Sequence, residues 1–264
     1  MDLQLTGKRA LVTGSTSGIG FAIARQLAAE GAEVIINGRS RSGVSATIAR
    51  LLEAQPDAKV TGIAADLGTA AGCEALVTTC ADVDILVNNL GIFDPRPFEE
   101  IDDTEWFHFF ETNVMSGVRL SRHYLPAMKA RNWGRIVFIS SESGICPPAE
   151  MVHYGMSKSA QLSVARGIAE TCTGSGVTVN SVLPGPTRTE GVTTFFGSLA
   201  EEQGVSLEQA EKDFFANARP TSLLKRFIDP AEVANLVAYV CSPLSSATHG
   251  AALRVEGGVV RSMV

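Results

Sequence analysis

A tyrosine and a lysine four residues apart are the side chains in this sequence best suited to proton transfer. Tyr154 and Lys158 frame the segment Tyr154-Gly155-Met156-Ser157-Lys158, at the start of an expected helix. This spacing places both on one helix face, one turn apart. A neighbouring ammonium favours the phenolate, and a fall of about three units in the Tyr154 pKa, equivalent to about 4 kcal/mol, would suit it to acid–base catalysis. A packed tyrosine beside a solvated lysine is the plainer alternative.

A serine at the end of a predicted strand is the candidate partner of this pair. Ser141 follows the apolar run Arg135–Ile139, and ligands bind beyond the carboxyl ends of such strands. Ser140 and Ser143 compete for the same role. Alternation along the chain predicts that the Glu142 carboxylate points away from a ligand.

The stretch from Thr13 to Gly20 predicts a phosphate-binding turn. It follows the expected strand Ala10–Val12 and precedes the expected helix Phe21–Ala29. Glycine permits positive φ and a close approach of phosphate, and unpaired N–H groups at a helix start attract anions. A tight connection without a ligand is the alternative. The expected phosphate contacts are Gly14, Ser15, Thr16, Ser17, Gly18, Ile19 and Gly20.

The end of the second expected strand, Glu33–Asn37, indicates which dinucleotide binds. An acidic residue there bonds the ribose of NAD, whereas a basic residue accommodates the 2′-phosphate of NADP. Gly38 stands where the acid would be, and Arg39 and Arg41 follow it. Arginine suits bidentate phosphate contact, so NADP(H) is favoured and NAD(H) stays possible. The arginines could instead be solvated loop charges, and Ser17 adds no second basic contact.

Strand-like and helix-like segments alternate along the chain. Strands that are apolar throughout suit a sheet covered on both faces, and the alternation implies parallel strands. We predict one domain, residues 1–264, with a doubly wound, Rossmann-type parallel sheet of about seven strands and helices on both faces. The expected strands are 10–12, 33–37, 59–64, 84–88, 135–139, 177–182 and 251–255; the expected helices are 21–29, 44–54, 71–80, 103–131 (divided near Gly117), 156–171 and 230–241.

Residues 186–227 contain no convincing strand. The segment carries the aromatic pairs Phe195-Phe196 and Phe214-Phe215, with acidic helical sequence between them. A long segment at the carboxyl edge of such a sheet predicts a substrate lid. A surface hairpin or a subunit contact is the alternative.

Composition narrows the class of protein. A net charge of −6 gives no support to binding of nucleic acid or acidic membranes. No apolar run reaches transmembrane length, and the amino terminus lacks a signal-peptide pattern, which favours a cytoplasmic protein. The five cysteines are scattered without metal-ligand spacing, which predicts reduced thiols and no metal. Cys146 and His153 are weaker site candidates.

These motifs together resemble those of the short-chain dehydrogenase/reductase family, nearly from end to end. The departures are Leu90, at a position that is usually alanine, and Glu142 beside the serine. The resemblance rests on Thr13-Gly14-x-x-x-Gly18-x-Gly20, Asp66-Leu67, Asn88-Asn89-Leu90-Gly91, Asn113, Ser141, Tyr154-x-x-x-Lys158 and Asn180-x-x-x-Pro184-Gly185.

The resemblance implies a role for each matching residue. Tyr154 is the general acid/base, and Ser141 holds the substrate oxygen. Lys158 binds the nicotinamide ribose and lowers the Tyr154 pKa, and Asn113 holds a water in a proton relay. Further cofactor contacts are implied at Asp66, Leu67, Asn88, Gly91, Pro184, Gly185, Thr187 and Thr189.

The expected function is hydride transfer between NADP(H) and a carbonyl or alcohol, similar to a 3-oxoacyl reductase. An NAD-dependent alcohol or polyol dehydrogenase is the first alternative, and a non-catalytic NADP-binding sensor the second. The family implies a homotetramer or homodimer, with the closing segment Leu253–Val260 at an interface.

Overall fold

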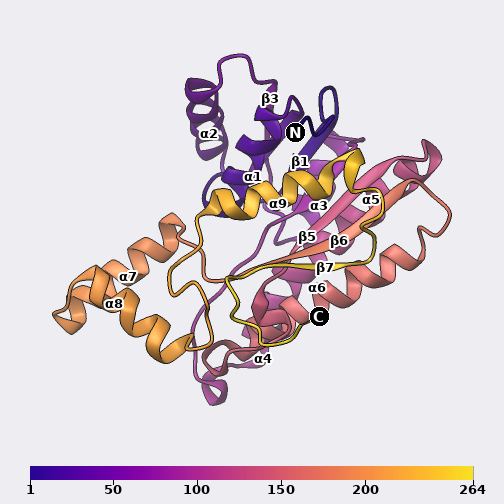
Figure 1. Cartoon of the computed structure of the whole chain (residues 1–264). Helices are drawn as coiled ribbons and strands as arrows, with labels where there is room; N and C mark the ends of the chain where they lie inside the picture. The colour runs from indigo at the N-terminus through magenta and orange to yellow at the C-terminus, as the bar shows by residue number, and fades with distance from the viewer. Residues whose placement is uncertain (264) are drawn as a thin grey trace.

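Seven parallel strands form one open sheet in the computed structural model, which describes residues 1–263 (Figure 1). The strand order β3-β2-β1-β4-β5-β6-β7 reverses between β1 and β4, which opens a crevice at their carboxyl ends. The predicted doubly wound sheet is therefore confirmed. The strands are β1 (Arg9–Val12), β2 (Glu33–Gly38), β3 (Val60–Ala64), β4 (Ile85–Asn88), β5 (Gly134–Ile139), β6 (Val177–Pro184) and β7 (Ala252–Val255).

Helices cover both faces of the sheet. Val12 and Val87 pack under one layer, whereas their neighbours Leu11 and Leu86 pack under the other. Burial on both faces explains why the strands are apolar throughout. The first layer holds α1 (Gly18–Ala29), α2 (Arg41–Ala54) and α9 (Pro230–Cys241); the second holds α3 (Ala70–Thr79), α5 (Ser116–Ala130) and α6 (Val152–Glu170).

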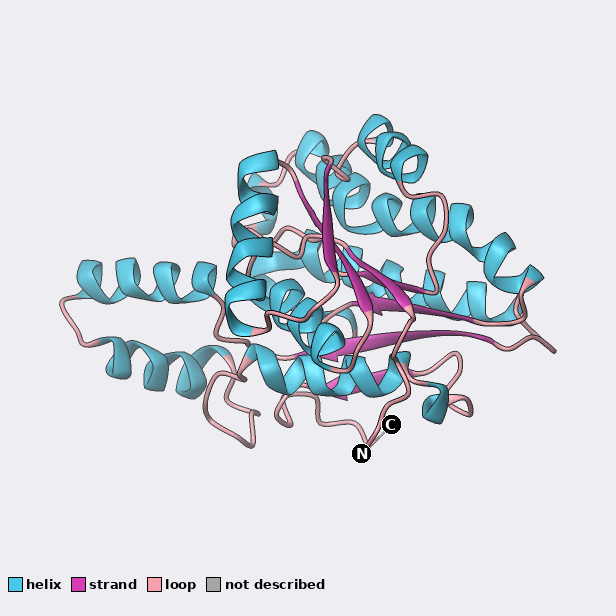
Figure 2. Cartoon of the chain, turned by 90° about the horizontal axis from the view of Figure 1, so that it is seen from above, coloured by secondary structure: helices cyan, strands magenta, loops and turns pink. Residues whose placement is uncertain are grey.

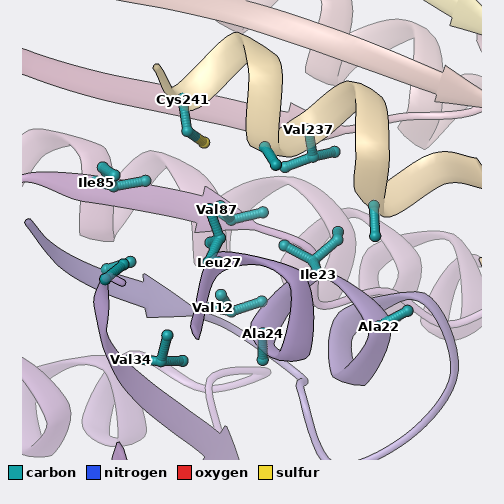
Figure 3. Close-up of a cluster of buried hydrophobic side chains, with 14 of the residues drawn as sticks. Val12, Ala22, Ile23, Ala24, Leu27, Val34, Ile85, Val87, Val237 and Cys241 are labelled. Atoms are coloured by element: carbon teal, nitrogen blue, oxygen red, sulfur yellow. The ribbon is translucent and has the colours of Figure 1, made fainter. Parts of the chain in front are cut away.

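The packing of α1 fixes the Gly-rich turn. Ile23 and Leu27 are fully buried among Val12 and Val87 of the sheet and Val237 of α9 (Figure 3). Each such side chain contributes about 1.5–3 kcal/mol by leaving water. The amino terminus of α1 is thereby held just beyond the end of β1.

A π-helical turn, which is wider than a turn of α-helix, divides the helical segment between β4 and β5. The segment begins with α4 (Asp103–Phe109), continues as a π-helix over Phe110–Met115 and ends as α5. The division lies slightly before the predicted point at Gly117 and contains Asn113. π-Helical turns of this kind are frequent at functional sites.

A helical hairpin projects from the body of the protein (Figures 1 and 2). It consists of α7 (Glu190–Gln203), α8 (Leu207–Asp213) and a π-helical turn at Phe214–Ala218. Phe196, Phe215 and other apolar residues give it a small core of its own. Short 3-10 helices lie at Phe98–Glu100, Glu142–Gly144, Ala149–Met151 and Pro243–Ser245.

Across residues 1–263, no helix has the length and apolar character needed to cross a membrane. In the same residues, no cluster of three or more His, Cys, Asp and Glu side chains is arranged to hold a metal ion.

Candidate active site

Side chains at the ends of β2 and β4, the strands on either side of β1, fix the Gly-rich turn between β1 and α1. Asn37 Oδ1 accepts a hydrogen bond from Gly14 N at 3.1 Å. Asn89 Nδ2 donates to Thr13 O at 2.9 Å and to Gly14 O at 3.1 Å. The turn is therefore shaped by the protein itself.

Three glycines suit this turn to phosphate. Gly14 and Gly18 have φ of +58° and +53°, a region that favours glycine. A Cβ at Gly20 would lie 2.5 Å from both Asn89 Nδ2 and Gly14 O, so no side chain fits. The Ser17 side chain caps no amide of α1, and Gly18 N donates to a carboxylate oxygen of Glu190 at 2.9 Å. This helix start therefore binds an anionic group.

The end of β2 excludes the acidic residue typical of NAD binding. A Cβ at Gly38 would stand 2.5 Å from Thr16 Cγ2, so an aspartate would displace Thr16. Arg39 and Arg41 are exposed beside this point. Arg50, which no motif in the sequence indicated, donates from Nη2 to Thr16 O at 3.2 Å. Arg39 and Arg41 follow the end of β2, and Arg50 contacts the Gly-rich turn, so three arginines belong to the segments next to the expected position of the adenosine ribose.

The other predicted cofactor contacts lie along the carboxyl edge of the sheet. Asp66 is exposed, and Leu67 is buried beneath it. A methyl group at Gly91 would stand 3.3 Å from Lys158 Nζ, which places Gly91 beside the predicted catalytic groups. The Asn88 side chain donates to Ser121 Oγ at 3.1 Å within the protein, so its amide does not line the cavity.

The segment after β6 forms the opposite wall. Pro184, Gly185, Thr187 and Thr189 all line the cavity. Thr187 Oγ1 donates to Gly185 O at 2.8 Å, whereas Thr189 caps the first turn of α7 by accepting from Val192 N. The wall of the site therefore continues directly into the hairpin.

The structure brings Tyr154, Lys158 and Ser141 to one cavity. Tyr154 and Lys158 lie in the first two turns of α6, and Ser141 follows β5. Lys158 Nζ donates to Ile139 O at 2.9 Å and to Gln161 Oε1 at 3.2 Å. These bonds use two of its three donors, and they anchor the ammonium between β5 and α6.

The pKa of Tyr154 is shifted in the direction opposite to the one predicted from the sequence. Burial, and secondly the charge of Glu142, raise the Tyr154 pKa above its ordinary value in the protein without cofactor, whereas a lowered pKa was expected with Lys158 and a cationic nicotinamide beside the phenol. Burial lowers the pKa of Lys158 to about 8. Its Nζ lies 5.6 Å from the centre of the Tyr154 ring and is directed to Ile139 and Gln161. The protein alone therefore holds Tyr154 as a protonated phenol, the form of an acid.

Asn113 is tied to the site through a glutamine that the sequence analysis missed. Gln161 Nε2 donates to Asn113 O at 2.6 Å, and its Oε1 accepts from Lys158 Nζ. The Asn113 side chain bonds Ile92 N at 2.8 Å and Ser157 Oγ at 2.9 Å. An amide thus bridges the Asn113 carbonyl and Lys158, where a relay water was predicted next to Asn113.

Replacing Gln161 by leucine should impair the lysine without removing it. The change keeps the side-chain size but deletes the bonds to Asn113 O and Lys158. A hydrogen bond to a charged group is worth about 1.5–3 kcal/mol, so kcat should fall about tenfold or more. Steady-state kinetics test this against Gln209→Leu, on the exposed face of α8. An unchanged kcat would contradict the bridging role.

Glu142 is directed into the cavity, which corrects the sequence prediction. Ser141 Oγ donates to Glu142 Oε2 at 2.5 Å, and Arg219 Nε lies 3.5 Å from Glu142 Oε1. The prediction from alternation failed because β5 has ended at Ile139, and a 3-10 helix begins at Glu142. Arg219 also pairs with Glu150 at 3.0 Å. A buried carboxylate–guanidinium cluster therefore adjoins the predicted catalytic serine.

The cavity has a volume of about 590 Å³ and extends from Ile19, in the Gly-rich turn, to the hairpin. Phe195, Phe196 and Phe214 line it, whereas Phe215 is buried in the core of the hairpin. Three of the four predicted lid phenylalanines thus reach the site. A mainly apolar wall faces the polar end formed by the serine and its neighbours.

The two weaker candidates lie outside this cavity. His153 is fully buried against Phe109, with ring centres 3.9 Å apart, and burial lowers its pKa. Cys146 is exposed and is not part of the cavity wall. Neither therefore faces the predicted catalytic groups.

Comparisons of sequence and of structure both match this chain to known dehydrogenases and reductases. The sequence profile of the family described as short chain dehydrogenase matches residues 8–198. The chain is 53% identical to the uncharacterized oxidoreductase YvaG of Bacillus subtilis, over the whole of both chains. It is 32% identical to the 3-oxoacyl-[acyl-carrier-protein] reductase FabG of Aquifex aeolicus, covering 98% of this chain and 100% of that one. The structure of L-sorbose reductase from Gluconobacter frateurii, complexed with NADPH and L-sorbose, matches over both whole chains with a TM-score of 0.93 and 29% identity.

Proposed function

The chain belongs to the short-chain dehydrogenase/reductase family, whose members are NAD(P)-dependent oxidoreductases, and we propose that it uses NADP(H) to reduce a carbonyl compound to an alcohol. One observation carries the proposal. Ser141, Tyr154 and Lys158 line the same cavity as Ile19 of the Gly-rich turn. A single ligand space therefore joins the predicted phosphate site to the predicted proton donor.

The chain offers a fitting cradle for this cofactor. The turn from Gly14 to Gly20 would take the pyrophosphate, because no Cβ fits at Gly20 and the Ser17 side chain caps none of the α1 amides. Arg39 would bind the 2′-phosphate, and Lys158 would bind the nicotinamide ribose. The remaining proposed contacts are Ser15, Thr16, Ser17, Gly18, Ile19, Asp66, Leu67, Gly91, Tyr154, Pro184, Gly185, Thr187, Thr189 and, through its backbone, Asn88.

The bound cofactor supplies the hydride. Tyr154 donates a proton to the substrate oxygen, for which its raised pKa keeps it protonated. Ser141 holds the same oxygen and stabilises its developing negative charge. Lys158, anchored by Ile139 O and Gln161, holds a proton beside the site, and Asn113 fixes Gln161.

Carbonyl-dependent oxidation of NADPH tests this proposal. Purified protein should consume NADPH only when a ketone or aldehyde is present. A Ser141→Ala variant should lose about 100-fold or more in kcat, the usual loss for one oxyanion donor. Equal rates for wild type and Ser141→Ala would refute this use of the site.

Removing the two exposed arginines should weaken the preference for NADPH over NADH. The double change Arg39→Gln with Arg41→Gln deletes the cations beside the 2′-phosphate, so the KM for NADPH should rise about tenfold or more. The KM for NADH should change little, since NADH lacks that phosphate. Arg25→Gln, on the exposed side of α1, is the matched control. An equal effect on both cofactors would contradict the phosphate contact.

We propose a neutral substrate with an apolar part, in the manner of a 3-oxoacyl reductase. The support is the row of phenylalanines from the hairpin, residues 186–227, which we propose to be a substrate lid. A polyol or ketose is the second candidate, because the polar Glu142–Arg219 end could bind hydroxyl groups. Comparing kcat/KM for an acyl ketone and a ketose distinguishes them.

We also propose that the single domain assembles as a homotetramer or homodimer. Phe107 of α4 is 71% exposed, and the closing segment Leu253–Val260 lies at the β7 edge of the sheet. Light scattering at micromolar concentration tests the assembly, and a monomer would refute it.

A further inference from the structure

The hydroxyl hydrogen of Ser141 is donated to the carboxylate of Glu142 in this structure. Ser141 Oγ donates to Glu142 Oε2 at 2.5 Å and accepts from Ser143 N at 3.1 Å. A hydroxyl has one hydrogen to donate. While Glu142 is ionised, that hydrogen serves the carboxylate, and Ser141 has none left for a carbonyl oxygen.

Protonation of Glu142 reverses this bond. The carboxylic acid then donates to Ser141 Oγ, which accepts from both Glu142 and Ser143 N. The serine hydrogen is released and can be donated to a substrate oxygen on the cavity side. From this geometry, and resting on the function proposed above, we propose that Glu142 is a positioning residue whose protonation state decides whether Ser141 donates to the substrate or to the carboxylate.

The surroundings of Glu142 make the protonated state accessible. Its side chain is buried, and burial raises its pKa above the ordinary value. Ser141 and Arg219 oppose the shift, and Glu150 shares the arginine. The titratable groups facing Glu142 from α6 are Tyr154 and Lys158, whose own ionisation is affected by it.

The sign of the pH dependence follows directly. Below the raised pKa, Glu142 is protonated and Ser141 donates to the substrate. As the pH rises through that pKa, Ser141 turns to the carboxylate and kcat/KM for carbonyl reduction falls. Tyr154, with its raised pKa, loses its proton at higher pH and does not account for this fall. A fall caused by Lys158, whose pKa is about 8, would persist in Glu142→Gln and is thereby distinguished.

Glu142→Gln is the decisive variant. Arg219 holds the amide oxygen on its own side, so the amide nitrogen faces Ser141 and donates to it at every pH. As the pH rises through the pKa of Glu142, we expect kcat/KM of the wild type to fall about tenfold or more. This is the effect of losing one hydrogen bond to a charged group. The same fall should be absent in Glu142→Gln.

Three further variants separate this role from general effects on the pocket. Glu150→Gln removes the other carboxylate on Arg219 without touching Ser141, so the fall with pH should persist. Arg219→Met removes the cation that opposes protonation of Glu142, so the fall should move to higher pH, and Arg219→Lys should move it back. Superimposable pH profiles for the wild type and Glu142→Gln would overturn the proposal.

An infrared titration tests the protonation state of Glu142 without measuring turnover. The wild type should show a protonated carboxyl band that persists above the pH at which an ordinary glutamate, with a pKa of about 4.3, is ionised. The band should be missing in Glu142→Gln and present in Glu150→Gln. Absence of such a band in the wild type overturns the inference about Glu142. Absence of carbonyl-dependent NADPH oxidation at every pH overturns instead the proposed function.

Discussion

Tyr154→Phe should lower kcat about 1,000-fold while leaving the affinity for NADPH within about threefold of the wild type, because general acid catalysis contributes about 10²–10⁴-fold. The change deletes one hydroxyl group and keeps the ring. That ring packs edge-on against Phe93, with centres 6.4 Å apart, so the cavity wall is retained. Steady-state kinetics and a fluorescence titration with NADPH measure the two quantities.

The control for this variant is Tyr239→Phe, which removes a hydroxyl from an exposed side chain of α9. It should leave kcat and NADPH affinity as they are. Undiminished turnover by Tyr154→Phe would show that another group supplies the proton. A parallel loss of cofactor binding would show that the hydroxyl acts in binding instead.

Lys158→Met should impair both turnover and cofactor binding. The methionine keeps the length of the side chain but removes the ammonium that Ile139 O and Gln161 hold at 2.9 and 3.2 Å. We expect kcat to fall about 100-fold or more, through loss of the proton held beside Tyr154. The KM for NADPH should rise about tenfold, through loss of a charged hydrogen bond.

The joint effect on kcat and KM distinguishes Lys158 from Tyr154. Lys59→Met, at an exposed site next to β3, is the control and should change neither value. Thermal unfolding should show that Lys158→Met folds, since burial already disfavours the lysine cation. A loss of kcat with no change in the KM for NADPH would contradict contact between Lys158 and the cofactor.

The fold could be predicted closely because its signals are local. The apolar runs of β1, β4, β5 and β6 need a sheet buried on both faces, and the alternation with helices fixes parallel pairing. The start of α6 was expected at Met156, but the helix begins at Val152. Residues 186–227 were expected to carry helical sequence between the phenylalanine pairs and to form a substrate lid, with a surface hairpin as the alternative. The bounds of α7 and α8 were not predicted, since these helices pack on their own phenylalanines.

Within the candidate site, only the residues whose position follows from their spacing in the sequence could be predicted. A spacing of four residues places Tyr154 and Lys158 on one face of any helix. Their presence at the same cavity therefore follows from the sequence. Gln161 and Arg219 matter through partners on distant segments, which no local pattern reveals. The direction of Glu142 depended on where β5 ends and a 3-10 helix begins. Their roles, like those of the predicted cofactor contacts, remain predictions for experiment.

The most direct test is a rate measurement on the wild type with NADPH and a panel of neutral ketones and ketoses. We expect NADPH oxidation that depends on the carbonyl compound, runs faster with NADPH than with NADH, and disappears in Tyr154→Phe. Saturable NADPH binding with no turnover on any carbonyl or alcohol would contradict the account and indicate a cofactor-binding sensor.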